Sequence, residues 1–121
     1  MSGFADHLAR LFAEGHKAPI PDLLSDAAFA RDGRRTPAAV LIAVTDVADN
    51  PQVILTQRPN TMRDHPGQVA FPGGKIDPGE DAITAALREA EEELALPPAA
   101  VRVIGASDDY VTGTGFIVTP V

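Results

Sequence analysis

The sequence predicts one α/β (α+β) domain, in which short apolar strands accompany one well-specified acidic helix. Three observations support this class. The chain has 121 residues, the size of one small domain, and 45% of them are hydrophobic, which is enough to form a core. Apolar runs typical of strands occur both before and after a clear helical pattern. Prolines, glycines and short polar stretches separate these segments.

At the N-terminus, apolar side chains recur at helical spacing within residues 4–14. They are Phe4, Leu8, Leu11 and Phe12. This pattern predicts a short amphipathic helix. Two prolines in HKAPIPD and a polar turn at 32–37 then interrupt regular structure. We therefore divide the chain into an N-terminal helix with its linker, residues 1–36, and a main domain, residues 37–121.

Four segments of the main domain predict strands. The run AAVLIAV, residues 38–44, is almost continuously apolar, and PQVILTQR, residues 51–58, follows it after a polar turn. These two segments are candidates for a hairpin. The other two candidates are VRVIGASDDYV, residues 101–111, and GFIVTPV, residues 115–121.

Residues 78–94 carry the clearest helical pattern. Asp77 and Glu80 are spaced as in a capping box, Pro78 suits the first helical position, and Pro97–Pro98 ends the helix. One apolar stripe is predicted to face the core, and it contains Ile83, Leu87, Ala90 and Leu94. A neighbouring arc carries a shelf of small residues, which are Ala82, Ala85 and Ala86.

Three glutamates continue that arc, and they could form either a solvated acidic face or a cation site. Glu89, Glu92 and Glu93 lie at positions i, i+3 and i+4, and the helix contains no lysine to balance them. A solvated acidic face usually has Lys or Arg one turn away from its carboxylates. Carboxylates that follow a glycine-rich turn suit Mg²⁺ and phosphate, because Mg²⁺ prefers oxygen ligands. The residues themselves leave both possibilities open, a solvated face and a cation site.

Charge and composition exclude several classes of partner. The net charge of −7 opposes bulk attraction to nucleic acid or to anionic membranes. The chain has no cysteines, which excludes disulfides and thiolate metal sites. Neither a basic start followed by an apolar run nor a window of membrane-spanning length occurs. We therefore expect a cytoplasmic protein without nucleic-acid or membrane partners.

The acidic helix and the glycines before it resemble the Nudix box, G-x5-E-x7-R-E-U-x-E-E-x-G-U, where U is a bulky apolar residue. The stretch GGKIDPGEDAITAALREAEEELAL supplies the first glycine and all five charged positions in register. They are Gly74, Glu80, Arg88, Glu89, Glu92 and Glu93. Two positions differ, because Ala90 is small for a U position and Ala95 replaces the second glycine. Alanine at a positive-φ helix exit would cost about 1 kcal/mol.

The upstream residues resemble the coenzyme A-directed subfamily of Nudix hydrolases, whose pattern is L-L-T-x-R-[SA]-x3-R-x3-G-x3-F-P-G-G. The chain has ILTQRPNTMRDHPGQVAFPGG, in which Ile54 and Pro59 differ from the pattern. The matching residues are Leu55, Thr56, Arg58, Arg63, Gly67, Phe71, Pro72, Gly73 and Gly74. The resemblance implies a Nudix fold, a mixed β-sheet sandwiched between α-helices.

The resemblance also implies roles for the matched residues. Glu89, Glu92 and Glu93 would bind Mg²⁺ or Mn²⁺ and act in catalysis, one of them orienting or deprotonating water. Glu80 would be an outer metal ligand or a helix-start residue, and Arg88 a structural partner of a box carboxylate. The implied substrate-binding residues are Arg58, Arg63, Gly73 and Gly74. The arginines suit bidentate contacts to phosphate or ordinary salt bridges, and the glycines suit close approach to a diphosphate or a simple turn.

The implied reaction is hydrolysis of the diphosphate bond of coenzyme A or its derivatives, giving 3′,5′-ADP and 4′-phosphopantetheine. Two alternatives stay open, which are hydrolysis of another nucleoside diphosphate derivative such as ADP-ribose, and a non-catalytic binding module. The chain stops within the strand-like GFIVTPV, whereas the resembling family continues, so the C-terminal part of the domain is expected to be absent. Uncovered apolar sheet would then favour a homodimer or other self-association.

Overall fold

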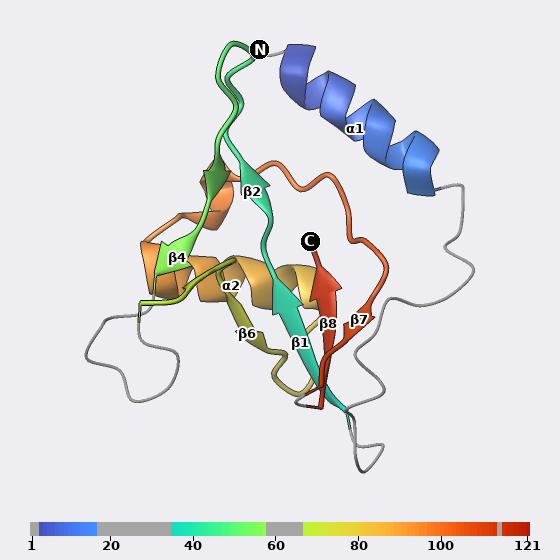
Figure 1. Ribbon diagram of the computed structural model, residues 1–121, viewed down its shortest axis with the longest axis vertical. Coiled ribbons are helices and arrows are strands. Elements are labelled where there is room, and N and C mark those ends of the chain that lie inside the picture. Colours follow the sequence, from blue (N-terminus) through green and yellow to red (C-terminus); the bar gives the residue numbers. More distant parts are fainter. Residues whose placement is uncertain (1–2, 17–34, 58–66, 114) are drawn as a thin grey trace.

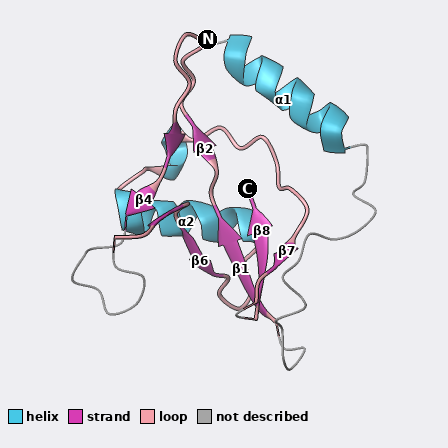
Figure 2. Ribbon diagram, viewed as in Figure 1, coloured by secondary structure: helices cyan, strands magenta, loops and turns pink. Residues whose placement is uncertain are grey.

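The structure is a computed structural model that describes residues 3–16, 35–57, 67–113 and 115–121 (Figures 1 and 2). In chain order its elements are α1 (Gly3–His16), β1 (Thr36–Val40), β2 (Ala43–Val44), β3 (Val53–Ile54), β4 (Thr56–Gln57), β5 (Val69–Ala70), β6 (Gly73–Lys75), α2 (Ala82–Leu94), the 3₁₀ helix η2 (Pro98–Ala100), β7 (Tyr110–Val111) and β8 (Phe116–Pro120). Helices and strands are mixed along the chain, which confirms the predicted α+β class.

The main sheet has four strands in the order β6-β1-β8-β7. The central strand β1 pairs antiparallel with β6 and parallel with β8, and β8 pairs antiparallel with β7. Within β1, Ala39 lies opposite Gly74 of β6 and Thr119 of β8. A parallel pair needs a long crossover connection, and α2 lies in the connection between β1 and β8. The sheet is therefore mixed, as the Nudix resemblance implies, and α2 crosses behind β1 and β6 in Figure 1.

Two short antiparallel ribbons lie outside the main sheet. One joins β2 to β3, which confirms the predicted hairpin, and the other joins β4 to β5. The predicted continuous strand 38–44 is interrupted between β1 and β2. At the interruption, the backbone N–H groups of Leu41 and Ile42 donate to the carbonyl oxygens of Pro72 and Val121, beside the ends of β6 and β8.

The C-terminal strand predictions are correct only in part. The segment 115–121 forms β8, but of residues 101–111 only Tyr110 and Val111 join the sheet, as β7. Residues 101–109 belong to no strand. Val101, Val103 and Ile104 of this segment line a cavity that is also lined by residues of α1 and β2.

The predicted N-terminal helix is present as α1 and is slightly longer than expected. It contacts the segment after η2 through an ion pair of 2.8 Å between Asp6 Oδ1 and Arg102 Nη1, and through the Phe12 ring, which lies against Gly105. An apolar cavity of about 710 Å³ lies between this helix, β2 and the chain end at Val121. No helix in the described ranges is both long enough and apolar enough to cross a membrane.

The core lies where α2 packs on β1. Buried alanines of α2, which are Ala85, Ala86 and Ala90, contact Ala39 and Leu41. The predicted core stripe is therefore wrong in part, because Ile83, Leu87 and Leu94 are only partly buried. The shelf of alanines faces the sheet and not the space beneath the carboxylates. Small side chains on both β1 and α2 let the two backbones approach closely, which turns the alanine arc inward.

Candidate metal and diphosphate site

A tight turn connects β6 to α2 and sets the direction of the acidic helix. The backbone N–H of Glu80 donates to the Asp77 carbonyl oxygen at 3.0 Å, and the Asp77 N–H donates back to Glu80 Oε1 at 3.0 Å. Gly79 has a φ of 80°, which the third position of a type II turn requires. Pro78 occupies the second position, where its fixed φ is favourable.

The helix α2 begins later than predicted. Its N-cap is Asp81, whose Oδ1 accepts a hydrogen bond of 2.7 Å from the Thr84 backbone N–H. This hydrogen bond lowers the pKa of Asp81 below its usual value. The predicted helix start at Pro78 is therefore wrong, because Asp77 and Glu80 close the preceding turn and do not cap the helix. The spacing of Asp77 and Glu80 fits a capping box and also a four-residue turn. The sequence pattern alone therefore did not identify Asp81 as the N-cap.

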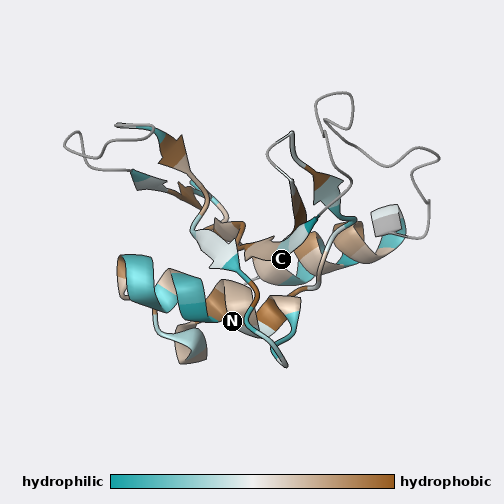
Figure 3. Ribbon diagram, turned by 90° about the horizontal axis from the view of Figure 1, so that it is seen from below, coloured by the Kyte–Doolittle hydropathy of each residue, from teal (hydrophilic) through white to brown (hydrophobic). Residues whose placement is uncertain are grey.

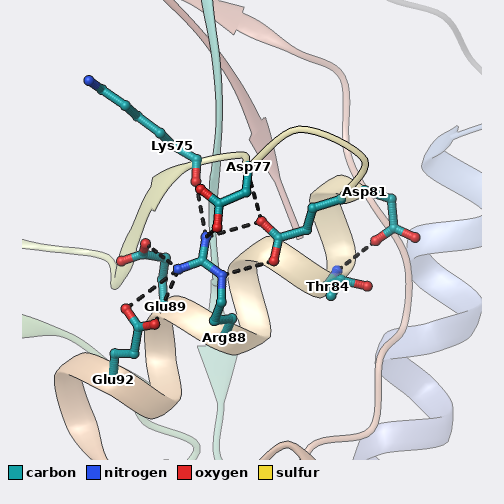
Figure 4. A network of polar contacts seen from close by, with 8 residues as sticks. Lys75, Asp77, Asp81, Thr84, Arg88, Glu89 and Glu92 are labelled. Carbon is teal, nitrogen blue, oxygen red and sulfur yellow. Dashed lines mark hydrogen bonds and ion pairs between the residues drawn. The ribbon is translucent and has the colours of Figure 1, made fainter.

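Arg88 joins β6, the turn and α2 through one polar network (Figure 4). Its Nε donates to Glu80 Oε2 at 2.8 Å and its Nη2 donates to Glu80 Oε1 at 3.0 Å, which forms a bidentate pair. The Nη2 group also donates to the Lys75 carbonyl oxygen at 3.2 Å and lies 3.4 Å from Asp77 Oδ2. Lys75 and Asp77 were not among the predicted site residues, and no sequence signal marks a backbone carbonyl as a partner.

The same network shifts the protonation equilibria of its members. The Arg88 hydrogen bond, followed by the Asp77 backbone N–H, lowers the pKa of Glu80. Conversely, hydrogen bonds to Glu80, Glu89 and Glu92 raise the pKa of Arg88. The Arg88 and Glu80 side chains are 28% and 12% exposed, so the pair is partly shielded from water. Arg88 therefore stays charged and fixed between the turn and the helix.

The remaining guanidinium nitrogen of Arg88 reaches two of the predicted metal ligands. Nη1 donates to Glu89 Oε1 at 2.9 Å and to Glu92 Oε1 at 3.3 Å, as Figure 4 shows. The Glu89 side chain is 18% exposed, whereas that of Glu92 is 58% exposed. Glu89 also lies against Gly74, where an added Cβ atom would be 2.7 Å from Glu89 Cδ. Glu89 is thus held on two sides, and Glu92 extends into solvent.

Glu93 completes the predicted set one turn after Glu89. Partial burial of its carboxyl group raises the pKa of Glu93, and the neighbouring Glu89 and Glu92 act in the same direction. The Gly73 backbone N–H opposes this shift. The last turns of α2, which carry these carboxylates, are teal in Figure 3. The structure therefore brings Glu89, Glu92 and Glu93 together at one end of the helix.

The donor set fits a hard divalent cation. Glutamate oxygens are the ligands that Mg²⁺ and Mn²⁺ prefer, and the pKa of Glu93 responds to the nearby Glu89 carboxylate. Within the described ranges, however, no three acidic or histidine side chains are already arranged as a metal site. Two of the three carboxylates turn toward the Arg88 guanidinium instead. A bound cation would have to compete with Arg88 for Glu89 and Glu92.

The other predicted site residues have different placements. Gly73 lies opposite Val40 in the sheet, and an added Cβ there would collide with the Ala39 carbonyl oxygen. Both Gly73 and Gly74 thus have a packing reason to be glycine, and their contact with a diphosphate stays a prediction. Arg58 and Arg63 lie outside the described residues.

Comparison with known proteins identifies the family of this chain. The family model described as the NUDIX domain matches residues 34–118. A Citrobacter koseri protein named Uncharacterized Nudix hydrolase NudL is 53% identical over 88 residues, which are 72% of this chain and 45% of the relative. The protein of that name from Escherichia coli (strain K12) is 54% identical over 85 residues, or 69% of this chain and 44% of the relative. The chain thus spans less than half the length of these relatives.

Two solved structures have a similar fold. A MutT/nudix family protein from Enterococcus faecalis gives a TM-score of 0.54 at 18% identity, covering 93% of this chain and 42% of that one. The Ap4A hydrolase of C. elegans gives a TM-score of 0.50 at 23% identity, covering 71% of this chain and 67% of that one. At these identities the likeness concerns the fold alone. The chain therefore belongs to the Nudix family, because the NUDIX domain model matches residues 34–118 and the bacterial relatives are more than half identical over the matched residues.

Proposed function

We propose that the protein hydrolyses a diphosphate bond in a nucleoside diphosphate derivative, with coenzyme A or one of its derivatives as substrate and Mg²⁺ or Mn²⁺ as cofactor. The products would be 3′,5′-ADP and 4′-phosphopantetheine. The observation that carries the proposal is the grouping of Glu89, Glu92 and Glu93 beside the glycines of β6. Arg88 offsets part of the charge of Glu89 and Glu92, and a divalent cation would offset the mutual repulsion of all three carboxylates.

In this proposal Glu89, Glu92 and Glu93 hold the cation, and one of them orients or deprotonates the attacking water. When bound, Mg²⁺ or Mn²⁺ supplies charge neutralisation on the diphosphate and activation of water. Both oxygens of Glu80 accept hydrogen bonds from Arg88, so we assign Glu80 mainly to holding that arginine, with any outer contact to the metal made through water. Arg88 in turn holds the side chain of Glu89 and makes a longer contact with the exposed Glu92.

Coenzyme A is proposed because residues 54–74 resemble the pattern of the coenzyme A-directed subfamily. Arg58 and Arg63 would bind substrate phosphates, since the guanidinium group suits bidentate contacts to phosphate oxygens. A chain of net charge −7 needs such local cations to attract an anionic substrate. Membership of the Nudix family fits another substrate, such as ADP-ribose, equally well.

A substrate panel tests the proposal. The protein is incubated separately with coenzyme A, ADP-ribose and a nucleoside triphosphate, each with Mg²⁺, with Mn²⁺ or with EDTA, and the products are separated by chromatography. We expect metal-dependent release of 3′,5′-ADP from coenzyme A, faster than cleavage of the other two compounds. Cleavage of ADP-ribose alone would refute the substrate and keep the reaction class. Binding of these compounds without hydrolysis would instead favour a non-catalytic binding module.

We also propose that copies of the chain associate with one another. Apolar side chains on and beside the two ribbons are strongly exposed, namely Ile42, Val47, Val53, Leu55 and Val69. Exposed apolar groups that lie close together are typical of protein interfaces.

A cytoplasmic location remains a prediction.

A further inference from the structure

Three glycines near the acidic helix would each be affected differently by an added side chain. Gly79 has a positive φ and nothing within 4 Å of an added Cβ, so its need is conformational. Gly73 faces the backbone of β1, where a Cβ would meet the Ala39 carbonyl oxygen. At Gly74 an added Cβ would instead meet the Glu89 carboxyl group, 2.7 Å from Cδ and 2.8 Å from each oxygen.

The backbone at Gly74 does not itself require glycine. Gly74 lies within β6, in register with Ala39 of β1, and its φ is outside the positive region. A residue with a side chain can adopt that conformation. What the missing Cβ provides is therefore space, and both carboxylate oxygens of Glu89 lie next to that space.

The Glu89 carboxylate can move more easily than the helix that carries it, but a move would break its contact with Arg88. On its other side, Arg88 Nη1 lies 2.9 Å from Glu89 Oε1. The helix that carries Glu89 is anchored by Ala85, Ala86 and Ala90, whose exposed fractions are 0%, 0% and 1%. A shift of the whole helix would open this close-packed contact with β1. A new methyl group at Gly74 would thus displace the carboxylate and not the helix.

We propose that Gly74 is a positioning residue that sets the place of the Glu89 carboxylate and thereby the affinity for a divalent cation. The second half of this statement rests on the proposed function, whereas the steric contact between Gly74 and Glu89 does not. Gly74 acts through Glu89, so the effect of changing it depends on which side chain stands at position 89.

Metal-free stability tests the contact. In EDTA, Gly74→Ala should lower the melting temperature by up to about 4 °C, because the displaced Glu89 carboxylate loses its ion pair with Arg88 Nη1. Glu89→Ala removes the carboxyl group, so adding Gly74→Ala to that variant should cause no further loss. Gly79→Ala is the matched control, because its strained backbone should lower the melting temperature equally with either residue at position 89. An equal loss from Gly74→Ala in both backgrounds would overturn the inference.

Cation binding tests the consequence. In Mn²⁺ titrations, Gly74→Ala should weaken binding by about tenfold or more, within the range seen when a residue supporting a metal ligand is replaced. Gly74→Ala with the shorter Glu89→Asp should bind no more weakly than Glu89→Asp alone. Wild-type affinity in Gly74→Ala would refute the positioning role.

Two further outcomes are informative. If wild type binds no Mn²⁺, the proposed function and the cation half of the inference both fail, while the metal-free comparison still decides the contact. If Gly74→Ala does not fold, recovery of folding by Glu89→Ala supports the inference. If neither Gly74→Ala nor its combination with Glu89→Ala folds, the inference is overturned.

Discussion

Arg88 directs its guanidinium donors to the carboxylates of Glu80, Glu89 and Glu92 and to the backbone of Lys75. Its hydrogen bond to Glu80 lowers the pKa of that carboxyl group below the ordinary glutamate value of 4.5. The pKa of Glu80 is lower in the folded state than in the unfolded state, so ionised Glu80 stabilises the folded protein. This stabilisation is fully present above about pH 4.5 and is lost as the pH falls through the folded-state pKa.

Replacing Glu80 tests this linkage. Glu80→Gln should lower the melting temperature at neutral pH and should weaken the fall in melting temperature between about pH 5 and pH 3. Thermal unfolding in EDTA at several pH values measures both effects. A loss of the same size at every pH would show that the ionised carboxylate is not the source of the stabilisation.

A second residue-scale feature is the left-handed conformation of Ala95, where φ is 57° and ψ is 29°. Its backbone N–H donates to the Glu91 carbonyl oxygen at 2.9 Å and ends the helix. Alanine is strained in this region, so Ala95→Gly should raise the free energy of unfolding by about 1 kcal/mol. Ala99→Gly is the control, because Ala99 lies in η2 without a positive φ, and it should be destabilising. Destabilisation by both changes in chemical denaturation would contradict the prediction.

At the scale of single elements, the start of α2 distinguishes two acids that sequence spacing alone does not. Asp81 accepts the Thr84 backbone N–H and caps the helix, whereas Asp77 belongs to the preceding turn. Asp81→Ala should therefore lower the melting temperature by several degrees, and Asp77→Ala should lower it less. Matched thermal unfolding of the two variants measures the difference. The reverse order would place the cap at Asp77, where the sequence first suggests it.

Much of the element pattern could be predicted from the sequence, because α1, the β2–β3 hairpin, α2 and β8 each have a local signal. The buried face of α2 could not. Periodicity selects the large residues Ile83 and Leu87, but the small Ala39 on β1 favours the alanine side of the helix. The charged positions of the site were likewise visible as a motif. The contact of Gly74 with Glu89 was not, because it depends on how closely β6 approaches α2.

At the scale of the whole molecule, exposed apolar side chains predict self-association. Val53 and Val69 lie on the two ribbons and are 49% and 52% exposed. In light scattering, wild type should show a mass above 12.7 kDa that rises with concentration. The double variant Val53→Thr and Val69→Thr should lie closer to the monomer mass, because threonine keeps the β-branched shape and reduces the apolar surface. A wild-type monomer at every concentration would contradict the prediction.

A Mn²⁺ titration of Glu92→Gln tests whether the carboxylates at the end of α2 bind a divalent cation. The control is Glu91→Gln, which makes the same change of charge about 100° around the helix from Glu92. We predict saturable binding to wild type, similar binding to Glu91→Gln and clearly weaker binding to Glu92→Gln. Equal affinities of all three proteins, or an equal loss in both variants, would show that Glu92 is not a ligand of the cation.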